Sequence, residues 1–183
     1  HWDDEPFDAI VSNPPYSTRR EGDGNPLLIN DPRFSPAGVL APKSKADLAF
    51  TMHMLSWLST SGTAAIVEFP GVLYRGGAEQ KIRKYLIDNN YIDCVIQLPP
   101  DLFFGTTIAT CVIVLKKSKK DNKTLFIDAS AEFVRGGNKN KLSETNRKKI
   151  LAAFIARQDA EYFAKLVDNK TIAENDYNIA VSS

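Results

Sequence analysis

Four consecutive residues near the start of the chain, Asn13-Pro14-Pro15-Tyr16, have side chains and spacing that could do chemistry. Asn13 offers a side-chain oxygen and Pro14 a backbone carbonyl, so two acceptors could bind the two hydrogens of a planar amino group. The two prolines fix φ and remove two competing N–H donors, while Tyr16 offers a flat face for stacking. Such acceptors favour the pyramidal, positively charged nitrogen that forms when an amine such as that of adenine attacks a methyl sulfonium.

The same four residues also have a purely structural interpretation. A rigid turn of two prolines often follows a strand, and a nearby tyrosine often only packs against it. The place of the motif favours chemistry, because ligands of an open α/β sheet bind where the strands reach their carboxyl ends. The hydrophobic pattern decides whether the chain forms such a sheet.

The chain alternates between apolar runs typical of strands and amphipathic stretches typical of helices. Strands are predicted over residues 7–13, 63–70, 91–99, 109–117 and 124–130, helices over 45–62, 76–90 and 143–158, and a short strand with a short helical turn over 162–181. This order predicts an open α/β sheet in which the strands 109–117 and 124–130 form an antiparallel hairpin at the edge. Residues 17–45, polar and rich in glycine and proline, are predicted to form a long loop.

The predicted helices have recognisable faces and ends. In the first, Leu48, Met52, Leu55 and Leu58 repeat at helical spacing, and Gly62 is expected to stop it. The second carries Ile82, Tyr85 and Leu86 on one face, and the third is expected to begin with Ser143 as its N-cap residue.

The amino-acid composition is typical of one soluble globular domain. Of the 183 residues, 43% are hydrophobic, which is enough to bury a core, and a net charge of +1 creates no global field for a nucleic acid. Cys94 and Cys111 lie inside apolar runs and are expected to be buried free thiols in a reducing compartment, so a cytoplasmic location is predicted. No apolar run of about 18 residues predicts a membrane span, and no signal peptide or metal site is expected.

Several blocks of the sequence occur in an order that resembles one known family. They are NPPY (13–16), KADLAFTMHMLSWLSTSGTAAIVEFPGVLYRGGAEQKIRKYLI (45–87), VIQLPPDLFFGTTIATCVIVLKK (95–117), LFIDAS (125–130) and IAENDYN (172–178). Over residues 7–178 they resemble the methylation (M) subunit of type I restriction-modification systems. NPPY alone is shared with glutamine and RNA methyltransferases, whereas the other blocks in this order are highly specific.

The resemblance implies a fold, a substrate and a methyl donor. The fold is a partial, Rossmann-like S-adenosylmethionine-dependent methyltransferase sheet with helices on both faces. The substrate is adenine in double-stranded DNA, flipped out of the duplex because a stacked base is inaccessible. The implied partners are a specificity subunit, which reads the DNA sequence, and a restriction subunit.

The resemblance also implies roles for particular residues. The catalytic clamp would be Asn13, Pro14, Pro15 and Tyr16; the base-stacking residues would be Tyr16 with Phe103 or Phe104; and the cofactor pocket would be bordered by Asn13, Asp47 and Phe50. The family's aromatic–x–Gly–x–Gly cofactor loop is absent, since Gly22-Asp23-Gly24 follows the NPPY motif instead of preceding it. Residues 1–183 are therefore expected to be the C-terminal portion of the catalytic domain, inactive alone and weak in binding S-adenosyl-L-methionine.

Two alternatives and two basic stretches stay open at this point. The chain could belong to a methyltransferase for a protein glutamine or an RNA base, or it could be a non-enzymatic fragment that only associates with partners. The basic stretches, Lys116–Lys123 and Arg135–Lys141, are either solvated hairpin tips or contacts for DNA phosphates.

Overall fold

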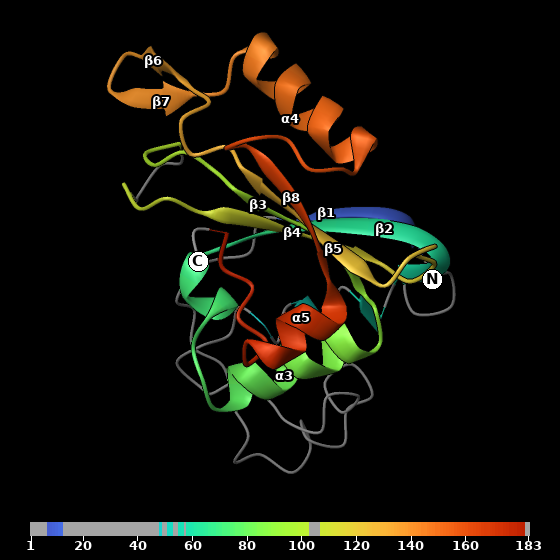
Figure 1. Cartoon of the computed structure of the whole chain (residues 1–183). Helices are drawn as coiled ribbons and strands as arrows, with labels where there is room; N and C mark the ends of the chain where they lie inside the picture. Colours follow the sequence, from blue (N-terminus) through green and yellow to red (C-terminus); the bar gives the residue numbers. More distant parts are fainter. Residues whose placement is uncertain are drawn as a thin grey trace.

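The computed structural model of the chain describes residues 7–12, 48, 51–52, 55–56, 58–102 and 107–181. Its centre is a six-stranded sheet in the order β1-β2-β4-β3-β5-β8 (Figure 1). The strands are β1 (Phe7–Ser12), β2 (Leu58–Glu68), β3 (Ile92–Gln97), β4 (Cys111–Lys116), β5 (Lys123–Asp128) and β8 (Ala164–Asp168). β1 is parallel to β2 and β3 is parallel to β5, while β4 is antiparallel to both β2 and β3. The carboxyl ends of β1, β2, β3 and β5 therefore meet at one edge of the sheet.

Helices cover both faces of this sheet, as the sequence predicted (Figure 1). α3 (Ala78–Asp88) and α5 (Asn169–Glu174) lie on one face, and α4 (Glu144–Ala156) lies on the other. Successive side chains of a strand point to opposite faces. β3 accordingly gives Val95 to the core beneath α3, and Cys94 and Ile96 to the core beneath α4. Ile92 also lies in the core beneath α3, because the pairing of β3 with β4 shifts register between Ile92 and Cys94.

The apolar face of α3 and the N-cap of α4 are confirmed. α3 buries Ile82 and Leu86 completely. At the start of α4, Ser143 Oγ accepts a hydrogen bond from the Asn146 N–H at 3.1 Å, and Asn146 Oδ1 accepts one from the Ser143 N–H at 2.9 Å. This reciprocal cap satisfies two N–H groups that have no partner inside the helix.

The predicted hairpin of the strands 109–117 and 124–130 is wrong. β4 lies between β2 and β3, and β5 pairs with β3 and β8. β4 is apolar on both sides, with Ile113 and Val114 both buried, and a strand without polar alternation is stable inside a sheet rather than at its edge. The connection 117–122 crosses only β3, about 10 Å away, which six residues easily span. The antiparallel edge is confirmed, but β5 and β8 form it.

The helix predicted over residues 45–62 ends earlier than expected. Residues 48, 51–52 and 55–56 are helical, whereas β2 already begins at Leu58 and runs through Gly62. Leu58 is buried, so its place in the core was predicted correctly and its element was not. The strand can start this early because its pairing with β1 is irregular: Phe7 lies opposite Leu58, but Ala9 lies opposite Thr63.

The C-terminal part of the chain forms the outer strand and covers its free edge. As predicted, residues 162–181 contain one short strand, β8, followed by one short helix, α5. Ala160 donates to and accepts from the backbone of Ala164, at 2.8 and 2.9 Å, and Asp159 Oδ1 accepts from the Leu166 N–H at 2.8 Å. The residues before β8 thus occupy backbone groups that an edge strand otherwise exposes.

The two cysteines are buried free thiols, as predicted. Cys94 packs beneath α4 and Cys111 packs beneath α3. Burial raises the pKa of the Cys94 thiol, so this side chain stays protonated and unreactive. Among the helices that the structure describes, none has the length and apolar character needed to cross a membrane.

Candidate functional site at the carboxyl edge of the sheet

The carboxyl edge of the sheet gathers the strand ends that precede the candidate motifs. β1 ends at Ser12, directly before Asn13 in the chain. Across the next strands Glu68 pairs with Cys111, Cys111 with Gln97, and Gln97 with Asp128. The last residues of β2, β3 and β5 therefore lie in one row. The sequence prediction that these loops begin at carboxyl strand ends is confirmed.

The candidate site residues themselves lie outside the described part of the chain. They are Asn13, Pro14, Pro15, Tyr16, Asp47, Phe50, Phe103 and Phe104. The structure describes the residues that adjoin them, and these show how the site is anchored.

One anchor joins the helical residues after Phe50 to the end of β2. Thr51 and Glu68 are both fully buried, and Thr51 Oγ1 donates a hydrogen bond to Glu68 Oε1 at 2.9 Å. The Glu68 backbone carbonyl accepts a bond from Cys111 Sγ at 3.4 Å. A buried carboxyl group needs a donor such as the Thr51 hydroxyl, because an unsatisfied one is costly. Sequence reasoning missed Glu68; its signal was a charged residue inside the apolar run TAAIVEFP.

A second anchor closes the loop that contains Phe103 and Phe104. The Leu98 N–H donates to the Thr110 carbonyl at 2.9 Å, and the Asp101 N–H donates to the Thr107 carbonyl at 3.2 Å. Gln97 Nε2 also donates to the Thr110 carbonyl, at 3.0 Å. These bonds join the two arms of the loop, so residues 102 and 107 lie at the ends of a closed neck.

A short hairpin contacts this neck from the α4 side of the sheet (Figure 1). It consists of β6 (Val134–Gly136) and β7 (Lys139–Lys141), joined by Gly137 and Asn138. Gly137 has φ +69°, the left-handed value that the first turn position of a tight hairpin requires. The basic stretch Arg135–Lys141 is therefore a hairpin.

The charges of this hairpin converge on Asp101. Lys139 Nζ lies 2.8 Å from Asp101 Oδ1, and Arg135 Nη1 lies 3.0 Å from Asp101 Oδ2. The hydrogen bond from Lys139, followed by that from Arg135, lowers the pKa of Asp101. Sequence reasoning weighed this hairpin as a solvated tip or a phosphate contact and missed Asp101. The only signal was an acidic residue after Pro99-Pro100, because its partners are far away in the chain.

The other basic stretch lies at the opposite edge of the sheet. Lys119 Nζ donates to the Ile92 carbonyl at 2.8 Å and to Asn90 Oδ1 at 2.6 Å, and it also bonds the Lys123 carbonyl. Burial lowers the pKa of Lys119 to about 8. Residues 117–122 therefore close the amino ends of β3 and β5, away from the candidate site.

The half-buried Lys119 predicts a pH dependence of stability. The pKa of Lys119 is about 8 in the folded chain and 10.5 when the side chain is fully solvated. Below pH 8 the lysine is charged in both states, and burying the charge destabilises the folded chain fully. Above pH 10.5 it is neutral in both states, and this destabilisation is absent. The free energy of unfolding of the wild type, relative to a Lys119→Met variant, should rise as pH increases through this window. Urea unfolding of both proteins at pH 7.5 and pH 9.5 measures the difference. A difference that stays constant or falls contradicts the assignment.

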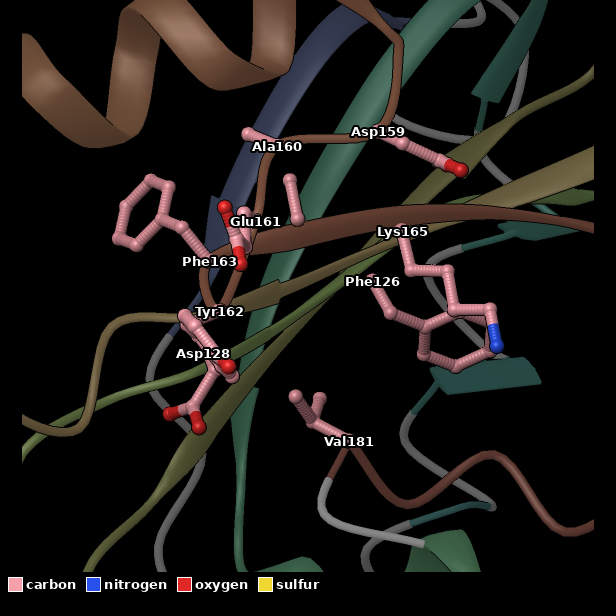
Figure 2. A pocket seen from close by; sticks show the side chains of 10 residues that line it. Phe126, Asp128, Asp159, Ala160, Glu161, Tyr162, Phe163, Lys165 and Val181 are labelled. Atoms are coloured by element: carbon pink, nitrogen blue, oxygen red, sulfur yellow. The ribbon is translucent and has the colours of Figure 1, made fainter.

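A cavity of about 540 Å³ lies beside β5 and β8, at the edge of the sheet remote from β1 (Figure 2). Its lining is Phe126, Asp128, Asp159, Ala160, Glu161, Tyr162, Phe163, Ala164, Lys165 and Val181. Three strands separate β5 from β1, so this cavity lies roughly 20 Å from the end of β1. The cavity is therefore separated from the strand end that precedes the NPPY motif. No group of three or more His, Cys, Asp or Glu side chains within the described ranges could hold a metal ion.

The comparison with protein families decides the classification. The whole chain, residues 1–183, matches the family described as N-6 DNA methylase. The chain belongs to this family. The match confirms the resemblance to type I methylation subunits that the sequence blocks predicted.

Curated relatives of this N-6 DNA methylase chain are subunits of type I restriction enzymes. The chain is 52% identical over 176 residues to the MpnII methylase subunit of Mycoplasma pneumoniae, covering 96% of this chain and 32% of that protein. It is 36% identical over 182 residues to the MjaVIII methylase subunit of Methanocaldococcus jannaschii, with 96% and 31% covered. The chain thus spans about a third of the length of these relatives.

Solved structures share the fold of the N-6 DNA methylase chain. The methyltransferase subunit of a type I restriction-modification system from Streptococcus thermophilus is 46% identical, with a TM-score of 0.93 over 97% of this chain and 38% of that one. A chain of another type I restriction-modification system has a TM-score of 0.71 at 17% identity, over 96% of this chain and 37% of that one. The second comparison supports the fold alone.

Proposed function

We propose that this chain holds the target base while a methyl group is transferred from S-adenosyl-L-methionine to the exocyclic amino group of adenine in DNA. The observation that carries the proposal is the position of Ser12. It is the last residue of β1, on the carboxyl edge of the sheet, and the next four residues are Asn13-Pro14-Pro15-Tyr16. Open α/β sheets bind their ligands at this edge.

The chain's own residues would activate the amine by accepting its hydrogens. S-adenosylmethionine supplies a methyl carbon bonded to a positively charged sulfur. The Asn13 side-chain oxygen and the Pro14 carbonyl would each accept one N–H of adenine, so that the nitrogen lone pair is directed towards that carbon. As the new C–N bond forms and the C–S bond breaks, the nitrogen becomes positive, and both acceptors stabilise the charge. The ammonium product then loses one proton to water.

Aromatic residues would hold the base after it leaves the duplex. Tyr16 would stack on one face, and Phe103 or Phe104 on the other. Stacking of this kind is worth about 1–3 kcal/mol per base, which helps to offset the free energy of unstacking. The loop with both phenylalanines follows β3, whose carboxyl end lies on the same edge as that of β1.

The residues proposed for the methyl donor adjoin one of the described anchors. Asp47 and Phe50 are proposed to border its pocket with Asn13, and the Thr51–Glu68 bond fastens the adjoining helical residues to the strand beside β1. The only Gly-x-Gly sequence of the chain is Gly22-Asp23-Gly24, which follows the NPPY motif. We propose that residues 1–183 are the C-terminal portion of a catalytic domain, and that a glycine loop outside them supplies most of the donor site.

The intact subunit is proposed to work in the cytoplasm with double-stranded DNA, a specificity subunit and a restriction subunit. The support is the naming of the relatives, which are methylase subunits of type I restriction enzymes. The recognition sequence would then be read by the specificity subunit rather than by this chain.

A labelling experiment tests the substrate. The full-length subunit, meaning the complete protein that includes these 183 residues, is mixed with its specificity subunit and labelled S-adenosylmethionine. Unmethylated genomic DNA, RNA and a glutamine-containing protein are offered separately. We expect label only in DNA, as N6-methyladenine. Label in RNA or glutamine, with none in DNA, would overturn the proposal in favour of those substrates.

Calorimetry distinguishes an enzyme from a chain that only associates with partners. We expect S-adenosylmethionine to bind the full-length subunit and to bind the 183-residue chain weakly or undetectably. Binding by neither protein would favour the non-enzymatic alternative.

A further inference from the structure

We propose that Asp101, Arg135, Lys139 and Asn140 form a clamp that positions the segment carrying Phe103 and Phe104 for stacking on the target base. The inference rests on the proposed function, because it assigns the stacking role to that segment. The four clamp residues are positioning residues, since they would act on the base only through the phenylalanines. We call them the Asp101 clamp.

The hairpin holds the arm by which the chain enters the aromatic segment. The Asn140 N–H donates to the Asp101 carbonyl at 2.9 Å, and Asn140 Nδ2 donates to the Pro100 carbonyl at 2.9 Å. Asn140 is 8% exposed, so water competes little for these bonds. The backbone of two consecutive residues is thereby fixed, and Phe103 follows two residues later.

Asp101 holds the arm by which the chain leaves the aromatic segment. The Asp101 N–H donates to the Thr107 carbonyl at 3.2 Å, so Asp101 joins both arms to the hairpin. Asp101 has φ +58°, a left-handed value that aspartate and asparagine adopt more readily than most residues. Its backbone conformation therefore favours a short polar side chain at this position.

Charge strengthens the contact between hairpin and loop. The Asp101 carboxylate is 17% exposed and faces Lys139 Nζ, which is 23% exposed, at 2.8 Å. Arg135 Nη1 lies 3.0 Å from the other carboxylate oxygen and also donates to Asn140 Oδ1 at 3.0 Å. Arg135 and Lys139 thus both direct charge-assisted hydrogen bonds at Asp101.

The competing interpretation is that Arg135 and Lys139 bind DNA phosphates. The two interpretations give opposite signs for one substitution. If the cations served phosphates, Asp101→Asn would remove a competing negative charge and strengthen DNA binding, with a steeper salt dependence. If Asp101 is the centre of the clamp, the same change loosens the aromatic segment and slows methylation.

Steady-state kinetics of the full-length subunit with its specificity subunit tests this. Asp101→Asn keeps the side-chain shape and the left-handed backbone, and the double variant Arg135→Gln/Lys139→Gln removes the other partners. We expect both variants to lose about tenfold or more in kcat/KM for DNA, since small displacements of positioned groups are costly. The Kd for S-adenosylmethionine should stay unchanged. Lys141→Gln, an exposed lysine on the same hairpin, should leave kcat/KM unaltered.

A fluorescence readout separates positioning from general stability. In duplex DNA with 2-aminopurine in place of the target adenine, identified from the methylated product, wild type should raise the fluorescence as the base leaves the stack. Asp101→Asn should raise it several-fold less at saturating enzyme. An Asp101→Asn variant with wild-type or higher kcat/KM and wild-type fluorescence would overturn the clamp.

Hydrogen exchange tests the clamp without any methylation assay. In the full-length subunit, Asp101→Asn should speed exchange of the amides of residue 101 and Asn140 at least several-fold, while the Val95 amide in β3 stays at the wild-type rate. Unchanged exchange at Asp101 and Asn140 would overturn the clamp. A wild-type subunit that methylates no DNA would instead overturn the proposed function, and the exchange result does not depend on it.

Discussion

The Asn13→Ala variant of the full-length subunit should methylate DNA about 100-fold more slowly than wild type, a loss comparable to removing one preorganised dipole from an oxyanion site. In the proposed reaction, the variant would leave one N–H of adenine without its acceptor at the moment when the nitrogen becomes positive. Because that charge is absent in the ground state, the loss should fall on kcat, with the KM for DNA changed only a few-fold. Single-turnover rates with labelled S-adenosylmethionine measure the chemical step directly.

Two further variants make this result interpretable. Asn13→Asp keeps an acceptor oxygen and should retain more activity than Asn13→Ala. Asn122→Ala removes an exposed amide from the connection at the opposite edge of the sheet and should match wild type. If Asn13→Ala folds normally and transfers methyl groups at the wild-type rate, the amide is not an acceptor in the reaction.

The Arg83→Ala variant of the 183-residue chain should lower the free energy of unfolding by about 3 kcal/mol, the loss typical of breaking a buried charged interaction. Arg83 is 1% exposed. Its Nε donates to the Tyr177 carbonyl at 2.9 Å and its Nη1 donates to the Val72 carbonyl at 2.9 Å. Burial lowers the pKa of Arg83 to about 10, and nearby Glu79 opposes that shift. Alanine would leave two carbonyls without these donors and a large empty volume beneath α3.

Urea unfolding followed by circular dichroism measures the effect, with the neighbouring residue as control. Lys84 is exposed, and its ion pair with Asp88 spans one helical turn at 3.0 Å. Lys84→Ala should therefore lower the free energy of unfolding far less than Arg83→Ala does, because an exposed ion pair is screened by water. Similar losses for the two variants would show that the contacts of Arg83 contribute little beyond helix propensity.

Features that depend on nearby residues could be predicted from the sequence. The cap at Ser143 involves a partner only three residues away, and the buried face of α3 follows from the spacing of Ile82 and Leu86. The position of β4 could not be predicted this way. The charged connection before Lys123 is compatible with a hairpin and with crossing one strand, and only the packing of β4 on both faces decides between them. Leu58 is apolar in either element, so periodicity could not place the end of the helix.

The candidate site shows the same division. The position of the NPPY motif follows from the apolar run before it, and the end of β1 at Ser12 confirms that position. The anchors could not be inferred, because each joins residues distant in sequence. Thr51 and Glu68 are 17 positions apart, and Asp101 and Lys139 are 38 apart. No local pattern links such pairs. Each pair has only one local signal, which is Glu68 inside an apolar run and Asp101 after two prolines.

Because the outer side of β8 is covered, the two edges of the sheet differ in their ability to pair with a further strand. On the β8 side, Ala160 and Asp159 already occupy outward backbone groups of Ala164 and Leu166, so an incoming strand meets a closed border there. Among the strands that the structure describes, β1 is the terminal one at the other side. A further strand that extends the sheet would therefore pair with β1, and a parallel one would bring its own carboxyl end beside Ser12. A polypeptide that adds a parallel strand to β1 would therefore end that strand next to the start of the Asn-Pro-Pro-Tyr sequence.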